Sequence, residues 1–391
     1  MPTRMKEQKK FEWTSIILIS LAHLVHDVFS SFFVPILPLL KAKMGLSNTG
    51  IGLLTVIQKT PALLNPLVGF VSDRLPMRIF IIAAPALTTI VMSLLGMAPN
   101  FAMLGILLFV AGLSGTFFHT PAPVMVKELA GENPGRGMSI FMLGGEGARA
   151  IGPLLITAAI TWWTLEGTWR LIPFGLASSF VLFLAFRKRP IRERIKQKPT
   201  FSDIKATFKR LLPFFLVLAG FIFFRNIAKS TMTTFITIYL HDKGETLWFT
   251  NSALAVLQLA GAVGVMFSGT ISDFIGKRKV LLIISIMTPI LMGLLFVVEG
   301  YLLIAVMLLL GFFMLSPGPV LLSLVNSMDT KHPAFVNGVF MTLGFIISAT
   351  TTLLIGMVSD RIGLELSFKL AAVLSLGAIP FVFMMTRGRT V

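Results

Sequence analysis

Long apolar runs recur along the entire chain and limit what it can fold into. Each run covers about 18 residues or more, and a helix rising about 1.5 Å per residue then crosses the roughly 30 Å of hydrocarbon in a bilayer. Charged residues make up 13% of the 391 residues, whereas an average soluble domain contains about 25%. We therefore predict an all-α membrane protein with twelve transmembrane helices, at residues 14–39, 47–71, 78–97, 101–125, 137–162, 169–187, 211–239, 246–271, 278–298, 301–326, 333–358 and 366–386.

The first apolar run follows a basic segment, as the hydrophobic part of a secretory signal would. It is longer than a signal sequence, contains charged residues and two prolines, and lacks a cleavage site of small residues. We predict that it is retained as a helix. The chain has no cysteine, which excludes disulfides and thiolate metal sites.

The basic charge of the chain is unevenly distributed over the predicted loops. The formal net charge is +17, with 34 Lys and Arg. If the N-terminus is cytoplasmic, most of these residues lie in cytoplasmic loops, which is the pattern that fixes orientation in bacterial membrane proteins. We therefore predict that both termini are cytoplasmic. The basic charge is explained by topology and by contact with anionic lipid headgroups, so no nucleic-acid partner is expected.

A polar segment between the sixth and seventh predicted helices divides the chain. It reads RKRPIRERIKQKPTFSDIKATFKR and is the longest polar stretch in the sequence. We predict an N-terminal six-helix bundle over 1–187, a cytoplasmic linker over 188–210 and a C-terminal six-helix bundle over 211–391.

A short pattern repeats in the two halves. GFVSDRLPMR follows the second predicted helix and GTISDFIGKRK follows the eighth; each places Gly and Asp four residues apart, with basic residues just beyond. Such an Asp can accept hydrogen bonds from the N-terminus of a neighbouring helix and hold one conformation closed. The residues predicted to act in gating are Gly69, Asp73, Arg74, Arg78, Gly269, Asp273, Lys277 and Arg278. A third copy, GMVSDRIG at 356–363, falls on the outer side in this topology with no basic run after it, so the pattern alone gives it no role.

These features resemble the major facilitator superfamily over nearly the full chain. A narrower similarity to the fosmidomycin-resistance branch of bacterial efflux proteins is carried by HLVHDVFSSFFVPILPLL, NPLVGFVSDR, GLSGTFFHTPAPVMVKELAGENPGRGMSIFMLGGEGARAIGPLL and FFRNIAKSTMTTFITIYL. The resemblance implies the major facilitator fold, two pseudo-symmetric six-helix bundles that alternate access to a central site. It also implies location in a bacterial inner membrane.

Ionisable residues inside the predicted helices are candidates for function, because charge at bilayer depth is costly. His23, His26 and Asp27 are spaced i, i+3 and i+4 and share one helix face. A carboxylate flanked by imidazoles can relay protons, since imidazole changes charge near neutral pH. Glu146 is the alternative proton carrier, and it lies in the glycine-rich stretch GGEGARAIGP, which allows close helix packing and is similar to a fifth-helix motif associated with antiport.

The membrane-embedded cations outnumber the carboxylates. Lys59, Arg149, Arg225 and Lys229 stand against Asp27 and Glu146. Buried charge needs a partner, so we predict an anionic substrate bound by Arg225, Lys229, Arg149 and Lys59, with Gln258 as a hydrogen-bonding neighbour. Structural alternatives remain open. Glu146 and Arg149 could simply pair, Asp27 could be neutralised by Lys59 or Arg225, and His119 could serve helix packing.

We predict a secondary active transporter that exports a small organic anion or amphipathic drug-like compound in exchange for protons. One alternative is uptake or exchange of an organic phosphate or carboxylate, and another is translocation of a lipid or lysolipid. No nucleotide-binding loop, paired metal-ligand motif or nucleophile elbow supports an enzyme. We expect no cofactor and no metal, and as partners only an anionic small molecule, protons and membrane lipids, in a monomer.

Overall fold

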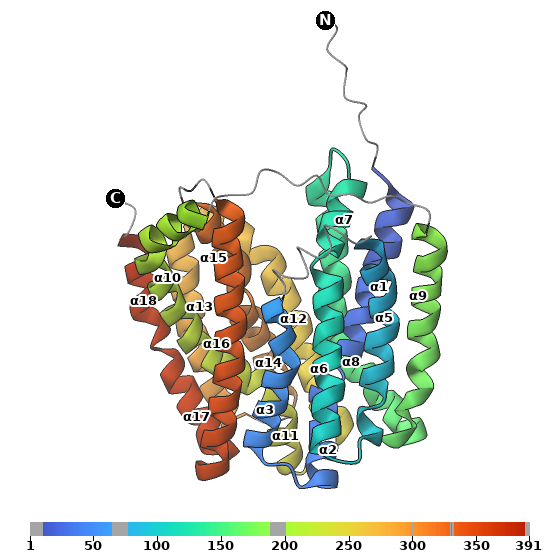
Figure 1. Ribbon diagram of the computed structural model, residues 1–391. Helices are drawn as coiled ribbons and strands as arrows, with labels where there is room; N and C mark the ends of the chain where they lie inside the picture. Colours follow the sequence, from blue (N-terminus) through green and yellow to red (C-terminus); the bar gives the residue numbers. More distant parts are fainter. Residues whose placement is uncertain are drawn as a thin grey trace, which may run out of the picture. The chain divides into compact units, whose positions relative to one another are not determined.

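The computed structural model describes residues 11–64, 77–187, 201–298, 300–328, 330 and 332–387. These residues are helical almost throughout and contain no strand (Figure 1). Nine of their helical segments are long and apolar enough to cross a membrane. Two further predicted helices, 137–162 and 278–298, coincide with α8 (Pro134–Trp163) and α13 (Lys277–Leu294). The predicted helix 47–71 begins with α3 (Asn48–Lys59), and its last residues, 65–71, lie outside the described residues. The protein is therefore an all-helical integral membrane protein, and twelve transmembrane helices are consistent with the structure.

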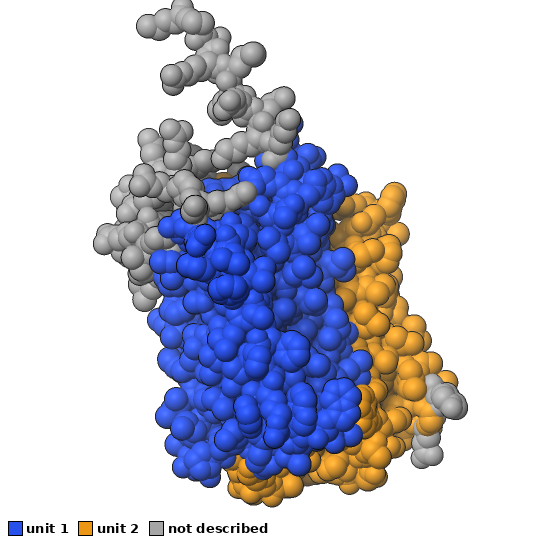
Figure 2. Space-filling model, turned by 90° about the vertical axis from the view of Figure 1, so that its right-hand side faces the viewer, with its two compact units in different colours: residues 1–33, 60–195 blue, residues 34–59, 196–391 orange. Residues whose placement is uncertain are grey.

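The chain forms two compact units, which Figure 2 shows in different colours. The first unit comprises residues 1–33 and 60–195, and the second comprises 34–59 and 196–391. One segment of the predicted N-terminal bundle, 34–59, thus packs with the second unit. The predicted domain limits at 187 and 211 remain a prediction.

The first unit is built around a long helix pair, α1 (Trp13–Ser30) and α8. Its other helical segments are η2 (Thr60–Leu64), α5 (Met77–Ser93), η3 (Leu95–Met97), α6 (Phe101–His119), α7 (Ala122–Leu129), η4 (Glu166–Leu171) and α9 (Ile172–Phe186). α5 packs against both α6 and α9. Burial of large apolar side chains such as Phe118, Phe141 and Phe186 in one cluster stabilises this arrangement.

Glycines set the close approach of α1 and α8. A methyl group on Gly144 would collide with the Ser20 carbonyl oxygen, and one on Gly152 would collide with Ser31. Because these glycines are about two turns apart, they lie on one face of α8, and the backbone of α1 rests directly on that face. The glycine-rich stretch of the fifth predicted helix therefore packs as closely as its sequence predicts.

The fourth and tenth predicted helices, which occupy equivalent places in the two halves of the sequence, are both interrupted. The fourth predicted helix breaks between α6 and α7 at Pro121, and the tenth breaks between α14 (Gly300–Leu315) and α15 (Pro317–Asn326). Proline lacks an amide hydrogen and ends the helix before it. Equivalent breaks in equivalent helices are expected of an internal duplication.

The first and seventh predicted helices are also interrupted, by turns of two different kinds. After α1 the chain passes through η1 (Val34–Ile36) into α2 (Leu37–Met44). After α10 (Phe201–Ser230) it passes through the π-helical turn η5 (Thr231–Phe235) into α11 (Ile236–Asp242). The π-helical turn η5 widens its helix locally, and such turns commonly occur at functional sites, whereas η1 is a tighter 3₁₀ turn.

The second unit is completed by α12 (Leu247–Ile275), α13, α16 (Pro333–Ile362), α17 (Leu364–Ser375) and α18 (Ala378–Arg387). α12 packs against α14, and α10 packs against α16, α17 and α18. The short helix α3 lies along α16. A buried apolar cluster that includes Leu218, Phe221 and Leu321 forms the core.

Candidate functional site

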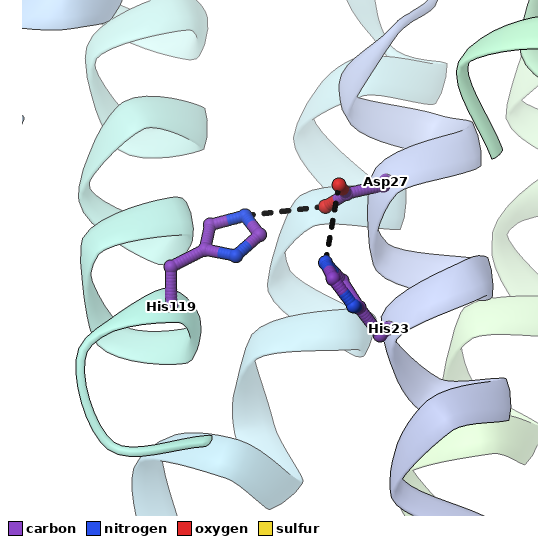
Figure 3. A group of neighbouring side chains, drawn as sticks. All are labelled: His23, Asp27 and His119. Carbon is purple, nitrogen blue, oxygen red and sulfur yellow. Dashed lines mark ion pairs between the residues drawn. The ribbon is translucent and has the colours of Figure 1, made fainter. Parts of the chain in front are cut away.

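Asp27 is surrounded by three imidazoles in the first unit, and Figure 3 shows two of them, those of His23 and His119. Its Oδ1 lies 2.9 Å from His26 Nδ1 and 3.2 Å from His119 Nε2. Its Oδ2 lies 3.3 Å from His23 Nε2. We call Asp27, His23, His26 and His119 the Asp27 cluster. Two helices supply it, since the first three residues lie on α1 and His119 is the last residue of α6.

Stacked rings and one hydrogen bond hold the imidazoles of α1 in place. His23 stacks on Phe141 at 4.0 Å between centroids, and its Nδ1 donates to the Phe141 carbonyl at 2.8 Å. His26 stacks on Phe118 at 4.8 Å. Second contacts of this kind fix which nitrogen of the ring faces the site. The imidazoles are therefore oriented by the first unit itself.

A glycine of α8 leaves room for the cluster. A methyl group on Gly145 would lie 2.5 Å from His23 Cε1 and 3.2 Å from Asp27 Oδ2. Any side chain at this position would therefore displace the imidazole from the carboxylate. The sequence reveals only a run of glycines, whereas the structure shows that one of them borders the candidate site.

Hydrogen-bond donors and acceptors require a proton within this group. A carbonyl oxygen only accepts, so the hydrogen bond to Phe141 places a hydrogen on His23 Nδ1. Nε2 of a neutral His23 is then a bare acceptor that faces a carboxylate oxygen at 3.3 Å. Two acceptors need a hydrogen between them, carried either by Asp27 or by His23. The geometry thus describes a site that shares a proton.

The cluster is reached through one of its members. The side chains of His23, His26 and Asp27 are 5%, 1% and 8% exposed, whereas that of His119 is 45% exposed. Nε2 of His26 is buried with no hydrogen-bond partner among the described residues. His119 is therefore the group through which a proton can pass between the surroundings and Asp27.

His119 is the functional candidate that sequence reasoning missed. From the sequence, helix packing is the role predicted for it. The available signal was the combination of a third membrane-embedded histidine with an Asp that already had two. Sequence spacing cannot show that α1 and α6 bring Asp27 and His119 together, because these two residues are 92 positions apart.

The second predicted proton carrier has a different environment. Glu146 and Arg149 form an ion pair on α8, with Arg149 Nη1 3.0 Å from Oε1 and 2.9 Å from Oε2 of Glu146. Their side chains are 17% and 50% exposed. The i, i+3 spacing brings them together on the helix surface. Arg149, predicted to bind substrate, is thus already paired within its own helix.

The other predicted substrate residues lie in the second unit. Lys59 Nζ donates to Ser348 Oγ at 2.7 Å between α3 and α16. Arg225 Nη2 donates to the Met314 carbonyl at 3.3 Å, and its Nε has no partner among the described residues. Lys229 on α10 and Gln258 on α12 are partly buried. Their role in binding a substrate stays a prediction.

The predicted gating residues are only partly described. Gly69, Asp73 and Arg74 lie outside the described residues, and Arg78 is in the first turn of α5. In the second unit, Gly269 and Asp273 lie near the end of α12. Lys277 Nζ donates to the Ser323 carbonyl at 3.1 Å, and Arg278 lies 4.5 Å from the Phe383 ring. The basic residues of the second copy thus join α13 to α15 and α18.

One group among the described residues has the composition of a metal site. His23, Asp27 and His119 each offer one ligand atom, and these atoms lie within 4.8 Å of one another. Imidazole and carboxylate are ligands for divalent transition metals. The expectation that the chain binds no metal is not tested by this geometry, and the shared proton accounts for the short contacts without one.

The chain is similar in sequence to known membrane proteins. A family model described as Major Facilitator Superfamily matches residues 19–351. The fosmidomycin resistance protein of Escherichia coli (strain K12) is 26% identical over 379 residues, which covers 94% of this chain and 91% of that protein. The multidrug resistance protein MdtG of Serratia proteamaculans (strain 568) is 24% identical over 67% of this chain and 66% of its own.

Solved structures agree on the fold. A bacterial homolog of the human lysosomal transporter Spinster, crystallised in an inward-facing and unoccupied conformation, matches with a TM-score of 0.79 at 14% identity. The match covers 97% of this chain and 98% of that one. The predicted fold and the predicted resemblance to fosmidomycin-resistance proteins are both confirmed, and the chain belongs to the major facilitator superfamily.

Proposed function

We propose that the protein is a secondary active transporter that exports a small organic anion or amphipathic compound in exchange for protons. The observation that carries this proposal is the Asp27 cluster, a proton-sharing group within a membrane-spanning helix. A carboxylate inside the membrane costs free energy, and such groups usually belong to functional sites. Three titratable partners, one of them half-exposed, give it a path for gaining and losing a proton.

The proton step follows from the positions of the three imidazoles. His119 takes a proton from the exposed side and passes it to Asp27 Oδ1, which lies 3.2 Å away. A half-turn of the protonated carboxyl group then directs its hydrogen toward His23, whose Nε2 accepts it and stabilises the neutral carboxyl. Protonation removes the negative charge of α1, and the two charge states favour different conformations of the carrier. Exchange of protons for substrate follows if substrate binds better to the deprotonated form.

The class of substrate is inferred from uncompensated positive charge. Arg225 Nε is buried without a hydrogen-bond partner among the described residues, and Lys59 donates to a neutral group, the Ser348 hydroxyl. A buried cation in such surroundings is stabilised by an anion. The names of the relatives, which refer to fosmidomycin and to multidrug resistance, support an exported small molecule. Fosmidomycin, a phosphonate, is therefore a suitable first probe.

The proposal is tested with purified protein in proteoliposomes that carry a pH-sensitive dye. With fosmidomycin on one side and no imposed gradient, its movement should drive protons in the opposite direction. A panel of small phosphonates, phosphates and carboxylates in a thermal-shift assay extends the search to other anions. Arg225→Lys should reduce the shift, because lysine lacks the forked donor. The anion proposal fails if no compound stabilises the wild type, and the coupling proposal fails if substrate moves without protons.

A further inference from the structure

The N-terminus of α3 is capped by a residue more than 300 positions away. Asp360, near the end of α16, accepts the Asn48 amide hydrogen on Oδ1 at 2.8 Å. Its Oδ2 accepts from the Thr49 amide at 2.8 Å and from Thr49 Oγ1 at 2.5 Å. The next amide, that of Gly50, donates to Ser47 Oγ at 3.0 Å. The first three free amides of α3 are thus satisfied, two of them by a carboxylate of another helix.

A carboxylate suits this position for electrostatic reasons. The N-terminus of a helix carries a partial positive charge, and a negative group there is stabilising. Hydrogen bonds to an ionised acceptor are also stronger than those between neutral groups. α3 has no acidic residue in its own first turn. Asp360 therefore supplies the charge that the sequence of α3 lacks.

Below this cap, α3 and α16 touch through glycines. A methyl group on Gly52 would lie 2.9 Å from Leu353 Cα, and one on Gly356 would collide with the Asn48 carbonyl oxygen. At the other end of α3, Lys59 donates to Ser348. In these contacts the residue numbers rise along α3 while they fall along α16. The two helices are therefore antiparallel and touch over the whole length of α3.

We infer that Asp360 is a latch that holds α3 on α16 and keeps the outer side of the transporter closed. This inference rests on the proposed alternating access. α3 belongs by sequence to the predicted N-terminal bundle, yet it packs within the second unit. When the outer side opens, α3 must part from α16, and Asp360 must then exchange its three hydrogen bonds for water. The latch therefore stabilises the outward-closed conformation.

The latch explains the third copy of the repeated pattern. GMVSDRIG places Gly356 and Asp360 four residues apart, as in the two predicted gating loops. Gly356 admits the backbone of α3, and Asp360, one turn further, caps it. No basic run is needed for this contact, since the amides of α3 provide the positive charge.

The absence of cysteine makes the latch testable by labelling. Ile51 is fully buried and precedes Gly52, which packs against α16, so labelling of a single Ile51→Cys should increase when α3 leaves α16. A membrane-impermeant maleimide is applied to right-side-out and to inside-out vesicles. In the Ile51→Cys background, Asp360→Asn should increase the labelling rate from the outer side about tenfold, because charge and one acceptor are lost.

Two matched variants complete the test. Thr49→Val keeps both backbone hydrogen bonds and should increase outer labelling about two- to threefold. Glu365→Gln removes another acidic residue of the same unit, whose partners Lys243 and Lys369 both lie in the predicted C-terminal bundle, and should leave labelling unchanged. The latch is overturned if Asp360→Asn labels as the wild type does, or labels faster from both sides alike. If Asp360→Asn does not fold, an unchanged rate in Thr49→Val overturns it.

These outcomes are independent of coupling. Labelling reports conformation without substrate or a pH gradient. If labelling responds as expected while fosmidomycin and the anion panel drive no proton movement, the latch stands and the proposed proton exchange fails. The opposite result leaves the exchange in place and removes the latch.

Discussion

Asp27 and Glu146 are carboxylates of the same unit, on helices that pack together, yet their partners differ in kind. Asp27 is almost fully buried and surrounded by three imidazoles, which can each accept or donate a hydrogen. Glu146 is more exposed, and both of its oxygens lie within 3.0 Å of one guanidinium nitrogen. A guanidinium stays protonated at every physiological pH. One carboxylate therefore sits in a titratable environment and the other beside a fixed counter-ion.

This difference indicates which group can carry a coupled proton. A coupling site must take up and release its proton in each cycle, so it needs neighbours that exchange protons. The Asp27 cluster has them, whereas protonation of Glu146 would leave Arg149 without its partner. We therefore expect proton coupling to depend on Asp27 and helix stability to depend modestly on Glu146.

The largest effect is expected from Asp27→Asn. The amide nitrogen can donate to His23 Nε2 and the amide oxygen can accept from His26, so the variant imitates a permanently protonated Asp27 and should fold normally. Proton-driven transport should fall by about 100-fold or more, as when a proton-transferring group is removed. Exchange of labelled for unlabelled substrate without a gradient should persist.

Proteoliposomes with an imposed pH gradient measure the first quantity and counterflow measures the second. Coupling by Asp27 is contradicted if the gradient still drives flux in this variant. Loss of counterflow as well would show instead that Asp27 is needed for the conformational change itself.

A second, smaller effect is expected when the packing beside the cluster is changed. Gly145→Ala places a methyl group 2.5 Å from His23 Cε1 and should push the imidazole away from Asp27. Gly147→Ala is the matched control, since its methyl group would find only Leu24 at 4.0 Å. We expect Gly145→Ala to lower the free energy of unfolding by about 1–3 kcal/mol, as overpacking does.

Proton-driven transport by Gly145→Ala should also fall about tenfold if the imidazole assists proton transfer. Thermal unfolding in detergent and gradient-driven flux are the two measurements. Equal behaviour of the two alanine variants would show that α1 yields at this position and that the close fit around His23 is not required.

The third effect concerns the exposed member of the cluster. His119→Gln keeps a donor to Asp27 Oδ1 but cannot pass on a proton. Wild-type flux should depend on pH, because the proposed exchange takes up a proton through His119 in each cycle. In the variant this pH dependence should flatten, and the rate should fall about tenfold or less, since Asp27 can still exchange protons with water slowly. An unchanged pH profile would remove His119 from the proton path.

Sequence and structure differ most where helices meet. The helices themselves follow from apolar length, and the face shared by His23, His26 and Asp27 follows from helical periodicity. Neither the contact of His119 with Asp27 nor the fit of Gly145 against His23 could be predicted, because both depend on the register between helices. No local pattern encodes that register, as the same glycine run could pack against any of several neighbours.

The repeated Gly and Asp pattern is a second case of this limit. Its two copies with basic residues attract attention in the sequence, and the third copy does not. Yet Asp360 is the one for which the structure shows a capped helix, while Asp73 lies outside the described residues. The pattern predicts a close-packing glycine and a hydrogen-bond acceptor at a helix end. What these two residues contact depends on which helix lies beside them.

The smallest effect is expected from Glu146 and Arg149, and it decides between the two carboxylates most directly. An ion pair this exposed contributes about 0–1 kcal/mol to stability. Glu146→Gln, Arg149→Gln and the double variant form a cycle whose coupling energy should fall in that range. Gradient-driven flux of Glu146→Gln should stay within about threefold of the wild type, because the remaining amide still accepts from Arg149. A loss as large as that of Asp27→Asn would reverse the assignment, since it would mean that Arg149 leaves Glu146 during the cycle and that the pair opens to admit a proton.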